Sequence, residues 1–242
     1  MSENVVPDAT SAENKGTQVE KMFDSISPRY DLLNRIMTFG IDRNWRKNAV
    51  EMLRPLKPRR ILDIATGTAD FAIEALRLDP EQVIGIDISN RMMDVGRQKI
   101  EARHASKIIT LQTASAESMP FADESFDAIT IGYGVRNFEN LDKGIDEIYR
   151  VLRKGGALVI LETSQPDATW KKIPVNLYTR ILVPALGRLI SRNDIAYKYL
   201  INSAQKFPYG EAFVGILKKH NFTAVVCKPL FFGVSSIYYA EK

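Results

Sequence analysis

Residues 60–70 read RILDIATGTAD and contain the features that decide the fold. A short apolar run ends near Ala65, a tight turn forms around Gly67, and an amphipathic stretch begins at Asp70. An apolar run of this length, bounded by a glycine turn, predicts a buried strand that leads into a helix. The stretch therefore predicts the first strand and the first helix of an α/β unit.

The same alternation continues along the chain. Further strand-like runs occupy residues 83–88, 108–114, 126–132 and 157–163, and residues 141–152 have helical periodicity. Strands that alternate with helices predict a parallel sheet wound on both faces, which is a doubly wound, Rossmann-like α/β fold.

The last part of the chain departs from this alternation. A helix at 210–220 is followed by two strands, 222–230 and 234–240, with no helix between them. Because parallel neighbours need a long crossover, we expect the two strands to form a final antiparallel hairpin.

A single domain accounts for most of the chain. Residues 1–16 are polar and predict a mobile tail, and residues 17–242 form the domain. Within it, residues 17–57 predict a helical cap, broken near Ser27-Pro28 and Gly40. Residues 164–205 interrupt the alternation after the fifth strand and predict an insertion or lid.

Composition excludes several classes of protein. Thirty-three Lys and Arg against 29 Asp and Glu give a net charge of +4, a small excess that mildly favours an anionic partner. No concentrated basic face or appended domain is visible, so we expect no nucleic-acid partner. The single cysteine, Cys227, and two isolated histidines predict neither a disulfide nor a metal site. With no export signal and no long apolar run, we expect a cytoplasmic protein.

The turn after the first strand is where doubly wound sheets bind nucleotides. A dinucleotide site would place glycines where this chain has Ala65, Gly67 and Asp70, and an acidic residue there would repel phosphate. A ligand with an adenosine, no phosphate and a cationic centre, such as S-adenosylmethionine, suits the loop better. An ordinary tight turn is the alternative.

Two further segments predict contacts with an adenosine. Asp87 ends the second strand and can accept hydrogen bonds from both ribose hydroxyls. It could instead cap the next helix, but Ser89 is the better cap. After the third strand, Ser115 and the amide of Ala116 are candidates for contact with the base.

Several stretches then form a recognisable pattern. The loop DIATGT, Asp87, SAESMPF and FDAITIG resemble class I S-adenosylmethionine-dependent methyltransferases. FDSISPRYDLLN (23–34), GVRNF (134–138) and FGVSSIYYA (232–240) are similar to the menaquinone/ubiquinone biosynthesis C-methyltransferase family over nearly the whole chain. Family members often have glycine at Ala69 and asparagine at Ser115. We expect a methyl group at Ala69 to cost little.

The resemblance implies an activity and a cofactor site. The activity is methyl transfer from S-adenosylmethionine to a ring carbon of a polyprenyl quinol, with demethylmenaquinol favoured over a benzoquinol or another small molecule. Asp63 is placed near the cofactor's amino group and Gly132 near its methionine tail, where glycine could simply permit close backbone approach. The remaining loop positions expected at the cofactor are Thr66, Gly67 and Thr68.

Arg136 and Asn137 follow the fourth strand and are expected to face the acceptor. Without the resemblance, Arg136 reads as a surface ion-pair residue with Glu139 or Asp142 as partner. With it, a phenol whose pKa is about 10 needs help to ionise, and a guanidinium can stabilise the resulting oxyanion. Arg136 is a poor base, so a water held by Arg136 and Asn137, or the carboxylate of Asp31, is the candidate.

Two more features bear on the acceptor. Tyr30 could hydrogen-bond a quinol oxygen or merely fasten the cap helix to the sheet. The insertion carries apolar residues interleaved with arginines, which suits transient contact with the inner face of a membrane. Alternatively, its apolar face packs on the domain or on a second copy of the chain, as in a homodimer.

Two readings without methyl transfer stay open as well. The chain could be a non-catalytic adenosine-binding module, or a nicotinamide oxidoreductase, which Asp70 disfavours.

Overall fold

The computed structural model describes residues 5–38, 40–166 and 194–242. Within these ranges, a seven-stranded sheet has the order β3-β2-β1-β4-β5-β7-β6. The strands are β1 (Arg60–Ile64), β2 (Gln82–Asp87), β3 (Ile109–Thr113), β4 (Phe126–Gly132), β5 (Leu152–Thr163), β6 (Thr223–Leu230) and β7 (Ser235–Glu241). The first five are parallel, and β7 is antiparallel to both β5 and β6. The predicted doubly wound sheet and final antiparallel hairpin are confirmed.

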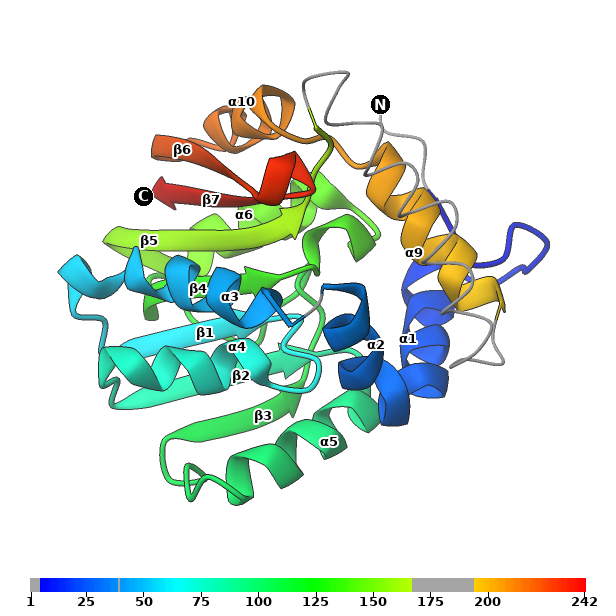
Figure 1. Cartoon of the computed structure of the whole chain (residues 1–242). Helices are drawn as coiled ribbons and strands as arrows, with labels where there is room; N and C mark the ends of the chain where they lie inside the picture. The colour runs from blue at the N-terminus through cyan, green and yellow to red at the C-terminus, as the bar shows by residue number, and fades with distance from the viewer. Residues whose placement is uncertain (1–4, 39, 167–193) are drawn as a thin grey trace.

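Helices cover both faces of the sheet and one of its edges (Figure 1). The helices α3 (Asp42–Glu51), α4 (Asp70–Glu74) and α5 (Asn90–Glu101) lie on one face, and α6 (Leu141–Val151) and α10 (Glu211–Lys219) lie on the other. At the edge where the parallel strands end lie α1 (Lys15–Ile26), α2 (Tyr30–Met37) and α9 (Asp194–Lys206). Short 3₁₀ turns are η1 (Ser27–Arg29), η2 (Arg54–Leu56), η3 (Ala75–Leu78), η4 (Val135–Asn137) and η6 (Phe231–Gly233).

Successive residues of each central strand enter different cores. In β1, Ile61 packs in the cluster that includes Phe71 of α4, and Leu62 packs in the cluster that includes Ile145 of α6. Both strand residues are fully buried. The strands therefore read as continuous apolar runs, because each face of the sheet is covered by helices.

Three boundaries differ from the sequence prediction. Asn14 accepts a hydrogen bond from the Thr17 amide and caps α1, which therefore begins at Lys15, before the predicted domain start at residue 17. The strand β5 begins at Leu152 rather than at 157, with a register shift against β4. The predicted insertion, 164–205, ends in a helix, α9, which packs on α1 and continues to Lys206. Residues 167–193 of the insertion, including the apolar residues that are interleaved with arginines, lie outside the described ranges.

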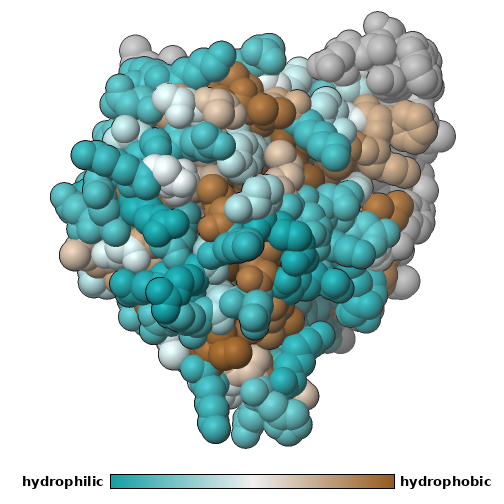
Figure 2. Space-filling model, turned by 90° about the vertical axis from the view of Figure 1, so that its left-hand side faces the viewer, coloured by the Kyte–Doolittle hydropathy of each residue, from teal (hydrophilic) through white to brown (hydrophobic). Residues whose placement is uncertain are grey.

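The edge opposite the cap, where the parallel strands begin, is largely polar. Figure 2 shows this side of the molecule, where apolar residues appear in narrow areas between charged and polar ones. Among the described helices, none is long and apolar enough to cross a membrane.

Candidate active site

A cavity lies at the ends of the central parallel strands and encloses about 790 Å³, including its solvent-open part. The cap covers it with Val19 and Phe23 of α1 and with Tyr30 of α2. Five of the eight residues predicted to bind the cofactor line this cavity: Gly67, Asp87, Ser115, Ala116 and Gly132. The parallel topology brings them together, because the loops that follow parallel strands meet at one edge.

The loop between β1 and α4 has an unusual backbone. Ala65, Gly67 and Ala69 all adopt left-handed conformations, with φ of 53°, 53° and 63°. A residue other than glycine in this region costs about 1 kcal/mol. The expectation that a methyl group at Ala69 is nearly free is therefore wrong, since only glycine adopts this conformation without strain.

Asp87, at the end of the neighbouring strand β2, accepts a hydrogen bond from this loop. One carboxylate oxygen accepts from the Gly67 amide at 2.8 Å and the other from the Ser89 amide at 2.8 Å. Ser89 caps α5, as expected, by accepting from the Met92 amide. Each Asp87 oxygen keeps acceptor capacity, and burial raises the pKa of this carboxyl to about 6. Asp87 is thus held in place with lone pairs available to the cavity that it lines.

Asp63 lies beneath the loop rather than in the cavity wall. It is fully buried, and it accepts from Thr66 Oγ1 at 2.6 Å, from Thr130 Oγ1 at 2.7 Å and from the Ala72 amide at 3.1 Å. Burial raises the pKa of Asp63 to about 6. Asp63 and Thr66 therefore hold the loop and the start of α4 together, and their predicted contact with the cofactor stays a prediction.

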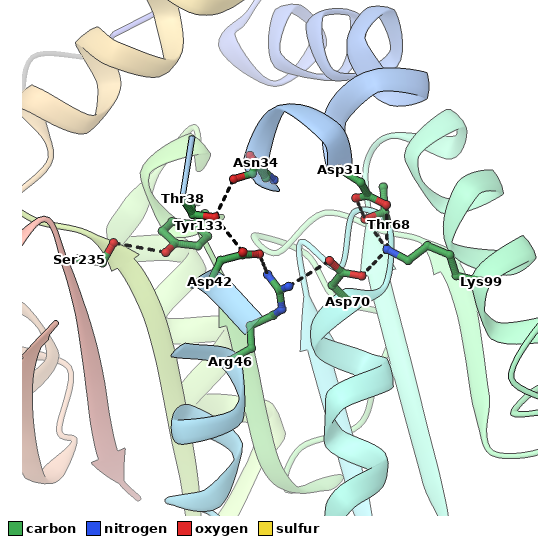
Figure 3. Close-up of polar contacts among 10 residues, drawn as sticks. All are labelled: Asp31, Asn34, Thr38, Asp42, Arg46, Thr68, Asp70, Lys99, Tyr133 and Ser235. Atoms are coloured by element: carbon green, nitrogen blue, oxygen red, sulfur yellow. Dashed lines mark hydrogen bonds and ion pairs between the residues drawn. The ribbon is translucent and has the colours of Figure 1, made fainter. Parts of the chain in front are cut away.

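Thr68 contacts the cap instead of the cavity (Figure 3). Its hydroxyl donates to Asp31 Oδ1 at 2.6 Å, and Lys99 Nζ donates to Asp31 Oδ2 at 3.0 Å and to Thr68 Oγ1 at 3.1 Å. Lys99 also pairs with Asp70. Both oxygens of Asp31 thus have partners outside the cavity and link the cap to the loop after β1, and its predicted role as a base stays a prediction.

The same polar network continues into α3 (Figure 3). Arg46 pairs with Asp70 at 3.2 Å and with Asp42 at 2.8 Å, and Asp42 accepts from Thr38 Oγ1 at 2.7 Å. The charge of Asp70 is therefore compensated by Lys99 and Arg46. Through these ion pairs Asp70 joins α3, α4 and α5, and its predicted repulsion of phosphate stays a prediction.

Arg136 lies in the η4 turn with only 7% of its side chain exposed. Its Nη1 donates to Glu162 Oε1 at 2.6 Å and to the Tyr133 carbonyl at 2.9 Å. The expected surface partners, Glu139 and Asp142, were therefore wrong. The partner of Arg136 is Glu162, which lies near the end of β5 and is fully buried. The sequence held a signal for Glu162, since this acidic residue is the last but one of the strand next to β4.

Arg136 does not line the large cavity, while Tyr133, Gly134 and Asn137 do. Its positive charge nevertheless acts electrostatically on Tyr30, which lines the cavity. Burial raises the pKa of the Tyr30 hydroxyl, and both a hydrogen bond with Asn34 and the positive charge of Arg136 oppose that rise. Arg136 would therefore favour a negative charge beside Tyr30, while the carboxylates of Asp87 and Asp31 would oppose it.

Asn137 forms hydrogen bonds with the backbone of one tyrosine and the hydroxyl of another. Its Nδ2 donates to the Tyr133 carbonyl at 3.3 Å, and its Oδ1 accepts from the Tyr199 hydroxyl at 3.1 Å. Tyr199 comes from α9 and is 2% exposed, and burial raises its pKa to about 12. Sequence reasoning missed Tyr199 because it lies 62 residues away, within the predicted insertion.

Lys15 fastens α1 to the η4 turn. Its ammonium donates to the Phe138 carbonyl at 2.7 Å and to the Arg136 carbonyl at 3.2 Å, and burial lowers its pKa. Within the predicted tail, no motif marked this residue. The turn that carries Arg136 and Asn137 is therefore held by groups from the N-terminal helix as well as from β5 and α9.

Two glycines allow close approach at the centre of the site. A Cβ on Gly132 would lie 2.8 Å from the Phe71 ring, and a Cβ on Gly134 would lie 2.5 Å from Ala65 Cβ. Any side chain at Gly134 would push the η4 turn away from the loop after β1. Close backbone approach therefore accounts for both glycines, whether or not Gly132 also touches a ligand.

Comparison with known proteins gives a consistent result. The model of the ubiE/COQ5 methyltransferase family matches residues 10–242. A demethylmenaquinone methyltransferase of Bacteroides fragilis is 47% identical over 229 residues, which is 94% of each chain. A ubiquinone/menaquinone biosynthesis C-methyltransferase of Geotalea daltonii is 42% identical over 230 residues, covering 94% of this chain and 97% of that one.

Solved structures agree on the fold. An S-adenosylmethionine-dependent methyltransferase of Thermotoga maritima, described as a possible histamine N-methyltransferase, superposes with a TM-score of 0.64 at 19% identity. The match covers 92% of this chain and 99% of that chain. At this identity the likeness concerns the fold alone.

Proposed function

Because this chain belongs to the ubiE/COQ5 methyltransferase family, we propose that it methylates a ring carbon of demethylmenaquinol to give menaquinol. It is an S-adenosylmethionine-dependent C-methyltransferase of quinone biosynthesis. The choice of a naphthoquinol is supported by the 47% identity to a relative named for demethylmenaquinone. The observation that carries the proposal is a single cavity lined both by the candidate adenosine contacts Asp87, Ser115 and Ala116 and by Tyr30 and Asn137.

The residues of the cavity fit S-adenosylmethionine. Asp87 offers two anchored carboxylate oxygens for ribose hydroxyls, and Ser115 with the Ala116 amide offers hydrogen bonds to a base. Gly67 and Gly132 also line the cavity, where the rest of the molecule would lie. When bound, the cofactor supplies an electrophilic methyl group on a positively charged sulfur.

At the acceptor end, the chain's own residues favour ionisation of the quinol. A ring carbon becomes nucleophilic as the adjacent hydroxyl loses its proton, and phenols hold that proton with a pKa of about 10. We assign Tyr30 and Asn137 to contact the ring oxygen and a water that takes its proton, respectively. Arg136 supplies positive charge close by, as its effect on the pKa of Tyr30 supports.

The test is methyl transfer by the purified protein from labelled S-adenosylmethionine. Reduced demethylmenaquinone and the matching demethylated benzoquinol are offered separately in detergent micelles. We expect label in the naphthoquinol product alone. Label in the benzoquinol alone would move the acceptor to the ubiquinone pathway, and label in neither, with calorimetry showing cofactor binding, would refute quinol methylation.

We also infer that the enzyme, in the cytoplasm, meets its acceptor at the inner face of the membrane. Phe231 and Phe232 support this, because 49% of the surface of Phe231 and 55% of that of Phe232 is exposed. Their turn precedes Ser235, whose hydroxyl lies 3.3 Å from that of Tyr133 in the cavity wall. Exposed aromatic residues beside the site suit the interfacial region of a bilayer.

Vesicle co-sedimentation tests this contact. Vesicles of phosphatidylcholine with phosphatidylglycerol should retain the wild-type protein, and Phe231→Ser/Phe232→Ser should release most of it. Val226→Ser is the matched control, because Val226 is 50% exposed on the edge strand β6. Equal retention of the double variant and of the wild type would contradict the assignment.

A further inference from the structure

Glu162 contacts both the backbone amide and the side chain of Arg136. It lies near the end of β5 and is fully buried. Its Oε1 accepts from Arg136 Nη1 at 2.6 Å, and its Oε2 lies 3.5 Å from the Arg136 amide nitrogen. The Thr163 amide, at 2.7 Å, and the Thr163 hydroxyl, at 3.1 Å, also donate to Oε1. The carboxylate is therefore itself anchored and leaves Arg136 little freedom.

The pair is electrostatically necessary where it lies. Burial works against the charged form of Arg136, and the Glu162 carboxylate together with Tyr30 and Tyr199 outweighs that effect, so the pKa of Arg136 lies above its ordinary value. A buried guanidinium without such a partner would be strongly unfavourable. Glu162 thus allows a permanent positive charge to exist behind the η4 turn.

The position of Arg136 explains what this charge can do. Nη1 is turned toward Glu162 and the Tyr133 carbonyl, and Nε is buried with no hydrogen-bond partner in the part of the chain that the structure describes. The Tyr133 carbonyl that Arg136 contacts belongs to a residue that lines the cavity, and the positive charge of Arg136 opposes the rise that burial causes in the pKa values of Tyr30 and Tyr199. Tyr30 lines the cavity, and Tyr199 donates to Asn137, which also lines it.

We infer that Glu162 is a positioning residue for methyl transfer, holding Arg136 so that its charge acts on the acceptor oxygen from behind the cavity wall. This role rests on the proposed function. Glu162 touches neither acceptor nor cofactor in this arrangement, and it acts through Arg136. Its removal should therefore matter only while Arg136 is present.

A double-mutant comparison tests this dependence. Glu162→Gln keeps the size of the side chain and removes its charge, and we expect kcat to fall about tenfold or more, because small displacements of a site group are costly. The affinity for S-adenosylmethionine and its KM should change less than about twofold. In an Arg136→Ala background, Glu162→Gln should cause no further loss. A multiplicative loss in the double variant, or wild-type kcat in Glu162→Gln, would overturn the inference.

Folding is controlled by replacing the whole pair. Arg136→Met/Glu162→Leu removes both charges and keeps apolar volume, an exchange that buried ion pairs often tolerate. This variant should bind S-adenosylmethionine and unfold cooperatively like the wild type while losing turnover. If turnover stays near that of the wild type, the pair has no role in catalysis and the inference fails.

A readout without turnover separates this inference from the proposed function. Arg136 Nε–H is buried, so its NMR signal, assigned by its absence in Arg136→Lys, should exchange slowly with solvent. We expect much faster exchange in Glu162→Gln, and equal exchange would show that Glu162 does not hold Arg136. Failure of the wild type to methylate either quinol would refute the proposed function, whatever this exchange measurement shows.

Discussion

The Thr68 hydroxyl donates a 2.6 Å hydrogen bond to the Asp31 carboxylate, 37 residues earlier in the chain. Thr68 follows Gly67 in the loop at the cavity, and Asp31 follows Tyr30 in the cap. This hydrogen bond therefore links the loop after β1 to the cap helix α2. Lys99 contacts both residues and stabilises the link (Figure 3).

Loss of Lys99 should loosen the cap. Lys99→Met leaves Asp31 and Asp70 close together without their common cation, and we expect a loss of about 1–2 kcal/mol in the free energy of unfolding, measured in urea. Affinity for S-adenosylmethionine should fall with it, because the loop and Tyr30 lose their connection. Lys218→Met, on the exposed side of α10, is the control and should leave both quantities unchanged.

Asp87 should control cofactor affinity. In Asp87→Asn, the amide nitrogen must face either the Gly67 or the Ser89 amide, so one hydrogen bond becomes a repulsion. We expect Kd for S-adenosylmethionine to rise about 10–100-fold, as for the loss of one or two hydrogen bonds to a charged group. Calorimetry measures this change, and an unaltered Kd would remove Asp87 from the site.

The pH dependence of cofactor binding should follow the same carboxyl group. The pKa of Asp87 is raised to about 6, so Asp87 is ionised and able to accept two ribose hydrogen bonds above this pH. As the pH falls from 8 to 5, protonation should weaken binding in the wild type. Asp87→Asn should show a flatter profile, and a profile as steep as that of the wild type would assign the effect to another group, with Asp63 the first candidate because its pKa is also about 6.

The stability of the cofactor-free protein should depend on pH with the opposite sign. Asp63 and Asp87 both have folded-state pKa values near 6, above the ordinary value of 3.8. Between about pH 4 and 6, the folded state holds more protons than the unfolded state, so stability should fall as pH rises through this window. Urea unfolding at several pH values measures it, and a rise across the same window would contradict both shifts.

Lys15 should matter for turnover more than for cofactor binding. Lys15→Met removes two hydrogen bonds to the η4 turn and keeps the apolar stem, so we expect kcat to fall about tenfold as Arg136 and Asn137 lose their support. Lys21→Met, on the same helix with 64% of its side chain exposed, is the matched control. Equal rates for the two variants would show that α1 only covers the site.

Much of this architecture follows from local patterns. The apolar runs at 60–65, 83–88 and 126–132 predicted strands, and the parallel order that follows from alternation with helices placed Gly67, Asp87, Ser115 and Gly132 at one edge. These residues come directly after strands, so their convergence needs only the topology. The strain at Ala69 was missed because a left-handed φ for alanine is set by the loop around it.

Other assignments depended on contacts that no local pattern records. Glu162 with Arg136, Tyr199 with Asn137, and Lys15 with the Phe138 carbonyl join residues 26, 62 and 123 positions apart. In the same way, Asp31, a candidate base by its position beside Tyr30, has its carboxylate directed to Thr68 and Lys99.

The sequence by itself determined the doubly wound sheet, the position of the candidate site at the strand ends and the family, because periodicity and strand-end motifs are local and the parallel topology gathers strand ends at one edge. Only the tertiary structure decided which charged groups face the cavity and which support it from behind. Burial, counter-charge and hydrogen-bond partners come from side-chain packing between distant segments. For Arg136, this meant a buried carboxylate on the neighbouring strand instead of a partner at the surface.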